Sequence, residues 1–207
     1  MKQFKIRASQ IGKIMGNAKK AGELSAGCIT FLKEWYAEQM YGDREEIKSK
    51  YCDKGNACED DAIDFVAEIT GLGFLMKNEK SFENEYITGT PDVLVNGEIL
   101  DTKCSWNGKT FLDSITDELN TDYEWQIRGY MNLSGYGKGR VCYCLMDTPD
   151  FVNYGNAVSY STVQNKARYF EFFVDYEEEK DRAIIEKVEK CREWLNEYGN
   201  LISSLLY

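Results

Sequence analysis

Hydrophobic residues recur at helical spacing in five parts of the chain. In RASQIGKIMG, the apolar residues Ile11, Ile14 and Met15 follow Ser9, so we expect a helix of roughly two turns with Ser9 as its N-cap. Four more helices are expected over residues 25–42, 53–71, 121–136 and 175–207. The second and third of the five end on a glycine, which is a common residue at a helix C-terminus.

Apolar runs bounded by turn-forming residues predict strands between these helices. The expected strands cover residues 73–82, 86–95, 98–106, 139–147 and 167–176. Residues 147–166 are the best candidate for a mobile loop. A chain of 207 residues is long enough for a real core and short enough for one domain, so we expect residues 1–207 to form a single domain.

The run GTPDVLVNGEILDTKC, residues 89–104, carries charges where a buried strand is expected. Asn96 and Gly97 form the strongest short signal for a hairpin, and a two-residue turn there fixes the register of its strands. That register places Asp92 directly opposite Asp101. Facing residues have Cβ atoms about 4.5–5.5 Å apart, so two like charges repel unless something neutralises them. The hairpin therefore predicts a bound cation.

Two more charged residues join this pair. Lys103 emerges on the same face as Asp101 because side chains alternate along a strand, whereas Thr102 points away. In the helix expected over 53–71, Glu59 belongs to the apolar face that packs inward, where a carboxylate needs a partner or a cation. The plainer alternatives are a solvated surface hairpin and a glutamate at the rim of the apolar stripe.

Such a set of groups suits metal-assisted hydrolysis. Carboxylate oxygens are the ligands that Mg²⁺ or Mn²⁺ prefers, and a neighbouring lysine can hold or deprotonate the attacking water. The metal lowers the pKa of that water and neutralises charge that builds on a phosphate. The hairpin therefore predicts phosphodiester hydrolysis.

The composition narrows the chemistry further. The chain has no histidine, which excludes Ser-His-Asp catalysis, Cys-His catalysis and most zinc sites. Its seven cysteines are odd in number and irregularly spaced, so we expect reduced, partly buried thiols rather than a disulfide framework or a metal cluster. Catalysis must therefore rest on carboxylates, lysine or a hard metal.

Charge and hydropathy bear on the partners and the compartment. The net charge of −10 argues against broad attraction to nucleic acid, although 25 Lys and Arg are enough to line one groove. The sequence has no run of about 18 apolar residues and no apolar signal-peptide core, so we expect a cytoplasmic protein with no membrane partner.

The motifs resemble a known family. TPD followed by ILDTK is similar to the signature of the PD-(D/E)xK nuclease superfamily, with Asp101 in the position where glutamate is more common. RASQIGKIM, GNACEDDA, QIRGYM and the late acidic helix with EWL follow the order of the YqaJ-like viral recombinase and lambda exonuclease branch. The resemblance covers roughly residues 6–198. It implies a restriction-endonuclease-like α/β (α+β) fold, with a central mixed β-sheet flanked by helices.

The resemblance also implies an activity and partners. It implies Mg²⁺-dependent (or Mn²⁺-dependent) hydrolysis of duplex DNA from its ends, often in the 5′→3′ direction, in phage-type recombination. The cell would be a bacterium or a phage-infected host. In lambda exonuclease the implied partners are double-stranded DNA ends, a single-strand annealing protein and two further copies in a homo-oligomeric ring of three, which the acidic charge makes less expected here.

The same resemblance implies roles for individual residues. Asp92 and Asp101 would bind metal with the backbone carbonyl of Thr102, Lys103 would orient the nucleophilic water, and Glu59 would bind a second metal or its waters. The shorter side chain of aspartate at 101 would draw the metal toward the strand without abolishing binding.

Three residues outside the hairpin match further motifs. Gln126 and Tyr130 fit the Gln-x-x-x-Tyr motif and would support the site or contact the DNA backbone, unless they serve ordinary helix packing. Arg7 would bind a terminal 5′ phosphate, since a guanidinium and a helix N-terminus both favour phosphate. An ordinary surface arginine is the alternative.

Two other functions stay open on the sequence alone. An endonuclease on the same core would use the same hydrolytic chemistry. A catalytically silent DNA-binding or assembly protein would keep the fold, although such relatives usually lose at least one ligand, and all four charged residues of the motif are present here.

Overall fold

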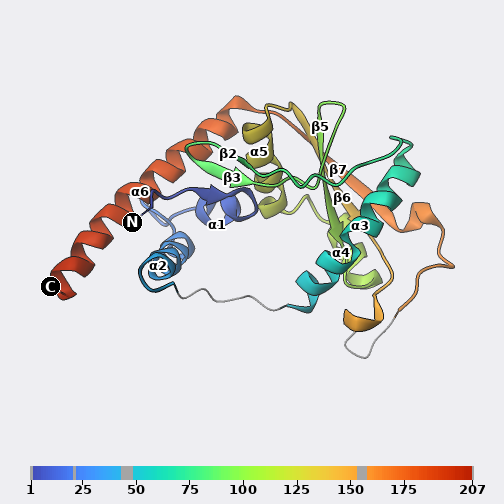
Figure 1. The fold of residues 1–207 in the computed structure, drawn as a ribbon, viewed down its shortest axis with the longest axis horizontal. Coiled ribbons are helices and arrows are strands. Elements are labelled where there is room, and N and C mark those ends of the chain that lie inside the picture. Colours follow the sequence, from blue (N-terminus) through green and yellow to red (C-terminus); the bar gives the residue numbers. More distant parts are fainter. Residues whose placement is uncertain (1, 21, 43–48, 153–157, 207) are drawn as a thin grey trace.

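A computed structural model describes residues 2–20, 22–42, 49–152 and 158–206 (Figure 1). The α-helices of this described part are α1 (Ile11–Met15), α2 (Ala26–Tyr41), α3 (Lys50–Thr70), α4 (Gly108–Thr116), α5 (Thr121–Ser134) and α6 (Glu178–Leu206). Its strands are β1 (Ile6–Arg7), β2 (Phe82–Glu83), β3 (Ile87–Gly89), β4 (Val93–Val95), β5 (Glu98–Cys104), β6 (Lys138–Cys144) and β7 (Tyr169–Asp175). The 3₁₀ turns are η1 (Ala8–Gln10), η2 (Asp150–Val152) and η3 (Asn165–Ala167).

Helices form near the predicted ranges because their ends carry the expected residues. The Ser25 hydroxyl accepts a hydrogen bond from the backbone N–H of Cys28 at 3.2 Å and so caps α2. Gly42 and Gly71 end α2 and α3 in the left-handed conformation, with φ of 70° and 68°. The predictions for these two helices are confirmed.

The first helix differs from its prediction, and one helix was not predicted. Ser9 is not an N-cap, because the turn already starts after Arg7 as η1 and α1 starts after Gln10. No helix was predicted over α4, where Asn107 and Thr110 form a reciprocal capping box at the start of the helix.

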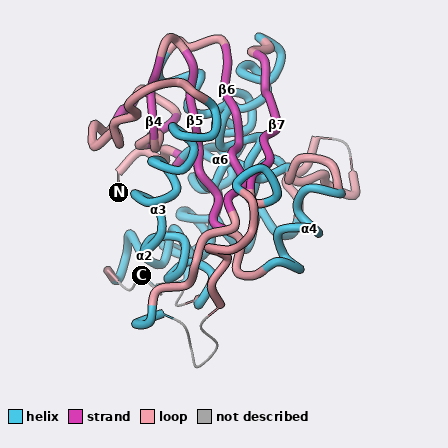
Figure 2. The backbone as a smooth tube through the Cα atoms, turned by 90° about the vertical axis from the view of Figure 1, so that its right-hand side faces the viewer, coloured by secondary structure: helices cyan, strands magenta, loops and turns pink. Residues whose placement is uncertain are grey.

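The strands form two mixed sheets, and Figure 2 labels the strands of the larger one. The larger sheet has the order β4-β5-β6-β7, in which β5 and β6 are parallel and the two outer pairs are antiparallel. The smaller sheet has the order β1-β3-β2. The predicted fold class, a mixed sheet flanked by helices, is confirmed, with the sheet divided in two.

Two predicted strands were too long. Residues 73–82 form no continuous strand: they contribute an isolated bridge between Lys77 and Val93 and the first residue of β2. Residues 86–95 split into β3 and β4 around Pro91, whose nitrogen cannot donate to a sheet ladder. Both differences shorten strands next to the aspartate hairpin.

Helices cover both faces of the larger sheet. α3 packs on the face that presents Leu100 and Cys142, whereas α5 and α6 pack on the face that presents Ile99 and Val141. Because side chains alternate along β5, Asp101 and Lys103 share the face of Ile99 and point toward α5. This alternation decides which helix completes the site.

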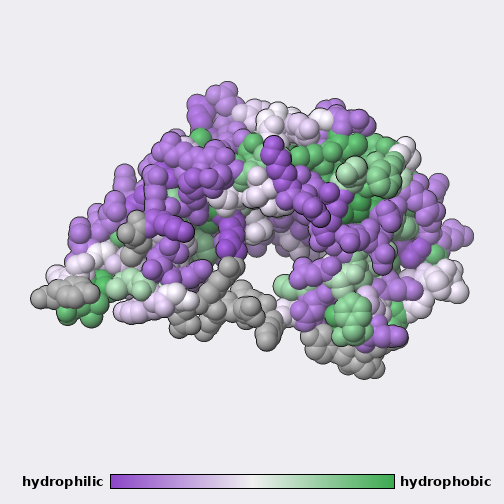
Figure 3. Space-filling model, in the orientation of Figure 1, coloured by the Kyte–Doolittle hydropathy of each residue, from purple (hydrophilic) through white to green (hydrophobic). Residues whose placement is uncertain are grey.

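The termini lie at the end of the molecule opposite α3 and α4 (Figure 1). The surface is hollowed on one side between these two ends (Figure 3). No helix among residues 2–20, 22–42, 49–152 and 158–206 combines the length and apolar character needed to cross a membrane.

The cysteines and the long loop bear on two predictions. All seven cysteines are free thiols in the structure, and five of them are buried. Within the predicted mobile loop, residues 153–157 lie outside the described part. Beyond them, the Tyr160 hydroxyl accepts a hydrogen bond from the backbone N–H of Gly108 at 3.1 Å, which connects the loop to α4.

Candidate active site

The hairpin forms in the predicted register. Val93 pairs with Leu100 and Val95 with Glu98, around the left-handed Asn96 and Gly97. Asp92 directly precedes β4 and stands one residue beyond the last pair of the ladder, Val93 with Leu100. The Asp92 carboxylate accepts hydrogen bonds from the backbone N–H of Thr102 at 2.8 Å and from its hydroxyl at 3.2 Å.

Asp101 is the centre of a chain of polar contacts that reaches into α5. Its side chain is fully buried, and its Oδ2 lies 2.5 Å from the Lys103 Nζ. The Gln126 amide donates to Asp101 Oδ1 at 2.9 Å and to the Tyr130 hydroxyl at 3.0 Å, while Lys103 Nζ donates to Gln126 Oε1 at 3.3 Å. The structure therefore brings together Asp92, Asp101, Lys103, Gln126 and Tyr130.

Burial sets the electrostatics of this cluster. It raises the pKa of Asp92 to about 7, and the charge of Asp101 adds to the rise. Burial likewise raises the pKa of Asp101, against the opposing effect of Lys103. Burial alone would lower the pKa of Lys103, but the two aspartates outweigh it and the pKa is raised. Lys103 is therefore a charged ammonium that donates hydrogen bonds here, and the two aspartates share its positive charge.

Glu59 lies at the rim of the site instead of in the core. It comes from α3, its side chain is 28% exposed, and its Oε2 lies 2.9 Å from the Lys77 Nζ. Lys77 also contacts Asp60 at 2.9 Å. The negative charge of Glu59 contributes to the raised pKa of both Asp92 and Asp101, which means that it acts on the same site. The inward packing predicted for Glu59 is only partly met, because its side chain is partly exposed and pairs with Lys77.

The donor set fits a divalent cation in part. No three acidic or cysteine side chains of the described residues converge closely enough to enclose a metal. The carboxylate of Asp101 does act on that of Asp92, whose pKa its charge helps to raise, and the buried Asp101 Oδ2 accepts no hydrogen bond of proper geometry despite its ion pair with Lys103. Such an atom is suited to a cation, with water or backbone oxygens completing the shell as is usual for Mg²⁺.

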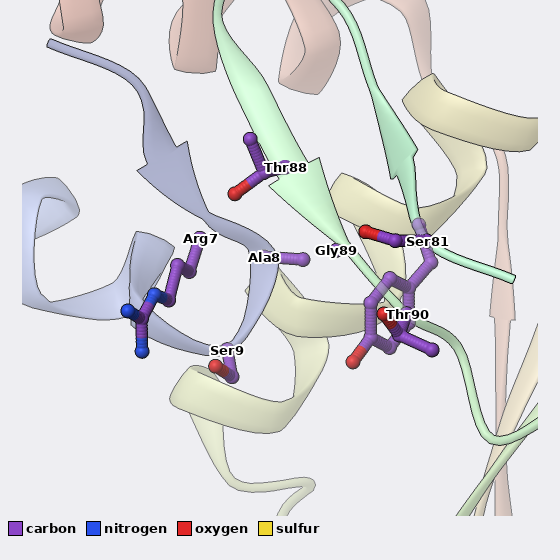
Figure 4. Close-up of a pocket in the computed structure, with 8 residues that line it drawn as sticks. Arg7, Ala8, Ser9, Ser81, Thr88, Gly89 and Thr90 are labelled. Carbon is purple, nitrogen blue, oxygen red and sulfur yellow. The ribbon is translucent and has the colours of Figure 1, made fainter. Parts of the chain in front are cut away.

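Arg7 lies beside a polar pocket next to this cluster (Figure 4). The pocket has a volume of about 320 Å³ and is lined by Arg7, Ala8, Ser9, Ser81, Thr88, Gly89, Thr90 and Tyr130. Arg7 is exposed, and Tyr130 connects the pocket to Asp101 through Gln126. Gly89 keeps the pocket close to Tyr130, since an added Cβ would come within 2.8 Å of that ring.

Comparisons with known proteins bear on this arrangement. No protein-family model and no curated protein matches the sequence. Among solved structures, a phage-related exonuclease from Haemophilus somnus 129PT is 25% identical, with a TM-score of 0.84 over 99% of this chain and 97% of that one. The alkaline exonuclease LHK-Exo from Laribacter hongkongensis is 17% identical, with a TM-score of 0.74 over 98% and 95%. Its complex with dAMP gives 18% and 0.73.

This chain has the fold of the phage-related and alkaline exonucleases. The resemblance that the order of motifs indicated, to the lambda exonuclease branch of the PD-(D/E)xK superfamily, is thereby confirmed.

Two residues of the site were not predicted from the sequence. Lys77 pairs with Glu59, but it stands in a segment predicted as plain strand. The Tyr123 ring lies under Lys103, with the Nζ 4.7 Å from its centroid. Tyr123 stands three residues before Gln126, so extending the Gln-x-x-x-Tyr spacing backward by one turn would have found it.

Proposed function

We propose that this protein is a metal-dependent deoxyribonuclease that hydrolyses phosphodiester bonds from the ends of duplex DNA, in the manner of phage recombination exonucleases. The observation that carries the proposal is the juxtaposition of Asp92, Asp101 and Lys103 on a buried hairpin. The likeness to two exonuclease structures over nearly the whole chain supports the same reaction class.

The proposed cofactor is Mg²⁺ or Mn²⁺. Asp92 and Asp101 would hold it together with the carbonyl of Thr102, and Glu59 would hold a second ion or its waters. When bound, the ion would supply a Lewis acid that makes the attacking water more acidic and offsets charge on the phosphate.

The chain's own residues have separate tasks in this proposal. Lys103 is charged and lies at the edge of the cluster with 20% of its side chain exposed, so it can donate a hydrogen bond to a water or to a phosphate oxygen. Gln126 fixes Asp101 through its amide N–H and Lys103 through its carbonyl. Tyr130 anchors Gln126 and lines the pocket.

The pocket beside Arg7 supports action at DNA ends. A guanidinium and several hydroxyls suit a phosphate, and a terminal phosphate held there would fix the end of one strand beside the carboxylates. This feature favours an exonuclease over an endonuclease and fits 5′→3′ digestion. The ring of three subunits and the annealing partner remain predictions from the family resemblance.

The test compares cleavage of two forms of DNA, one with ends and one without. The purified protein is incubated with Mg²⁺, a linear duplex with 5′ phosphates and a covalently closed circle, with separate labels on the 5′ and 3′ ends of the linear DNA. We expect loss of the linear DNA only, starting with the 5′ label. Nicking of the circle would favour the endonuclease, and no cleavage with either Mg²⁺ or Mn²⁺ would favour the silent binding protein.

A further inference from the structure

The ammonium of Lys103 has an aromatic neighbour that neither the motifs nor the metal chemistry explain. Asp101 and Gln126 bind the Nζ at 2.5 and 3.3 Å, and the centroid of the Tyr123 ring lies 4.7 Å from it. A cation within about 6 Å of an aromatic centroid is attracted by the negative face of the ring. Lys103 is therefore held by three groups: Asp101 and Gln126 through oxygen atoms, and Tyr123 through the face of its ring.

The ring is itself held in place. Tyr123 is half-buried in the first turn of α5, on the side that carries Gln126 one turn later. Behind it lies Tyr143 of β6, with ring centroids 6.2 Å apart. Tyr143 is also the residue that pairs with Lys103 across the parallel strands β5 and β6. The strand partner of Lys103 thus supports the ring that faces Lys103.

The Tyr123 ring can attract the Lys103 ammonium without also being a metal ligand, which Asp101 cannot do. Asp101 attracts the ammonium, but the same carboxylate is a proposed metal ligand and cannot serve both partners fully. An aromatic face attracts a cation, accepts no proton and excludes water from one side of it. The position of Lys103 then depends less on Asp101.

We propose that Tyr123 is a positioning residue for Lys103 and acts through its ring and not through its hydroxyl. The inference rests on the proposed nuclease function. The competing explanations are that Tyr123 only fills space between α5 and β6, or that its hydroxyl contacts DNA.

Three variants separate these explanations. Tyr123→Phe keeps the ring and removes the hydroxyl, whereas Tyr123→Leu and Tyr123→Met remove the ring but keep apolar volume. Trp125→Leu is the matched control, because Trp125 is on the same helix and lies under another lysine, Lys180, at 5.2 Å. Circular dichroism at the assay temperature identifies the variants that fold.

The first measurement is kcat and KM for digestion of a linear duplex with Mg²⁺. We expect Tyr123→Leu and Tyr123→Met to lower kcat by about 2- to 30-fold, the range of a cation–π contact, with KM within about twofold of the wild type. Tyr123→Phe should retain most of kcat, and Trp125→Leu should not change it.

The second measurement needs no activity. The metal-free protein is treated with an acetyl N-hydroxysuccinimide ester. Peptide mass spectrometry then gives the rate at which Lys103 is acetylated. Loss of the ring should raise the rate at Lys103 several-fold in the Leu and Met variants, but not in the Phe variant or the control.

The outcomes are distinct. An inactive wild type would refute the proposed function, and the acetylation rates would still test the position of Lys103. An active wild type with unchanged kcat in Tyr123→Leu would overturn the inference, as would an equal loss in Tyr123→Phe or a rise in KM alone. Unchanged acetylation of Lys103 without the ring would overturn it too.

Discussion

Asp92→Asn should make the metal-free protein more stable at alkaline pH while removing a metal ligand. Burial and the charge of Asp101 raise the pKa of Asp92 to about 7 from an ordinary value of 3.8. A raised pKa means that the folded state prefers the protonated carboxyl, so stability is full below pH 3.8 and falls as the pH rises through 7. The difference corresponds to about 4 kcal/mol lost by the wild type when Asp92 is fully ionised.

Asparagine at position 92 cannot ionise, so it removes the free-energy cost of a buried charge while keeping part of the hydrogen bonding. Its amide oxygen can still accept from Thr102, which now donates at 2.8 and 3.2 Å, but a neutral acceptor is weaker by about 1 kcal/mol. The net gain should therefore be about 2–3 kcal/mol at pH 8.5. About 2 kcal/mol of the cost develops between pH 5.5 and 8.5, so the advantage of the variant should shrink to less than about 1 kcal/mol at pH 5.5.

Urea unfolding followed by circular dichroism in EDTA measures this directly at pH 5.5, 7 and 8.5. Asp64→Asn, at an exposed position on α3, is the control and should show no such trend. A variant less stable than the wild type at pH 8.5, or a difference that does not change with pH, would refute the electrostatic account of the hairpin.

Three further substitutions test other contacts. Lys103→Ala should lower the cleavage rate of linear DNA by about 100-fold or more in a steady-state assay, and a fold intact by circular dichroism with undiminished cleavage would argue against its role. Arg7→Gln should reduce the preference for a 5′-phosphorylated over a 5′-hydroxyl end by about 10-fold in competition assays, whereas an unchanged preference would make Arg7 an ordinary surface residue. Lys54 is fully buried and donates to the carbonyls of Trp106 at 3.0 Å and Met146 at 2.7 Å, so Lys54→Met should lower the free energy of unfolding by about 2–4 kcal/mol in urea titrations, and no loss would show that these bonds contribute little.

The hairpin was predictable from local rules. Asn-Gly fixes a two-residue turn, the turn fixes the register, and alternation along β5 puts Asp101 and Lys103 on one face. Helix ends with strong signals, such as Ser25 and Gly71, were predictable for the same reason.

What the sequence could not supply depends on tertiary contacts. Glu59 pairs with Lys77, which lies in a segment that the sequence predicted as a strand because that segment is apolar at Phe74 to Met76. The contact between Tyr123 and Lys103 could not be predicted, because it arises only from the packing of α5 across β5 and β6. The pattern of hydrophobic and polar residues predicts the face of a helix or strand on which a residue lies. It does not predict which residue of the adjacent element that side chain contacts.

The most direct test of the central claim, that the buried aspartate hairpin holds a catalytic metal, is calorimetric titration of the protein with Mn²⁺ at pH 8. We expect saturable binding by the wild type and its loss in Asp101→Asn, with circular dichroism showing that the variant is folded. Absence of binding by the wild type, or equal binding by the folded variant, would contradict the account.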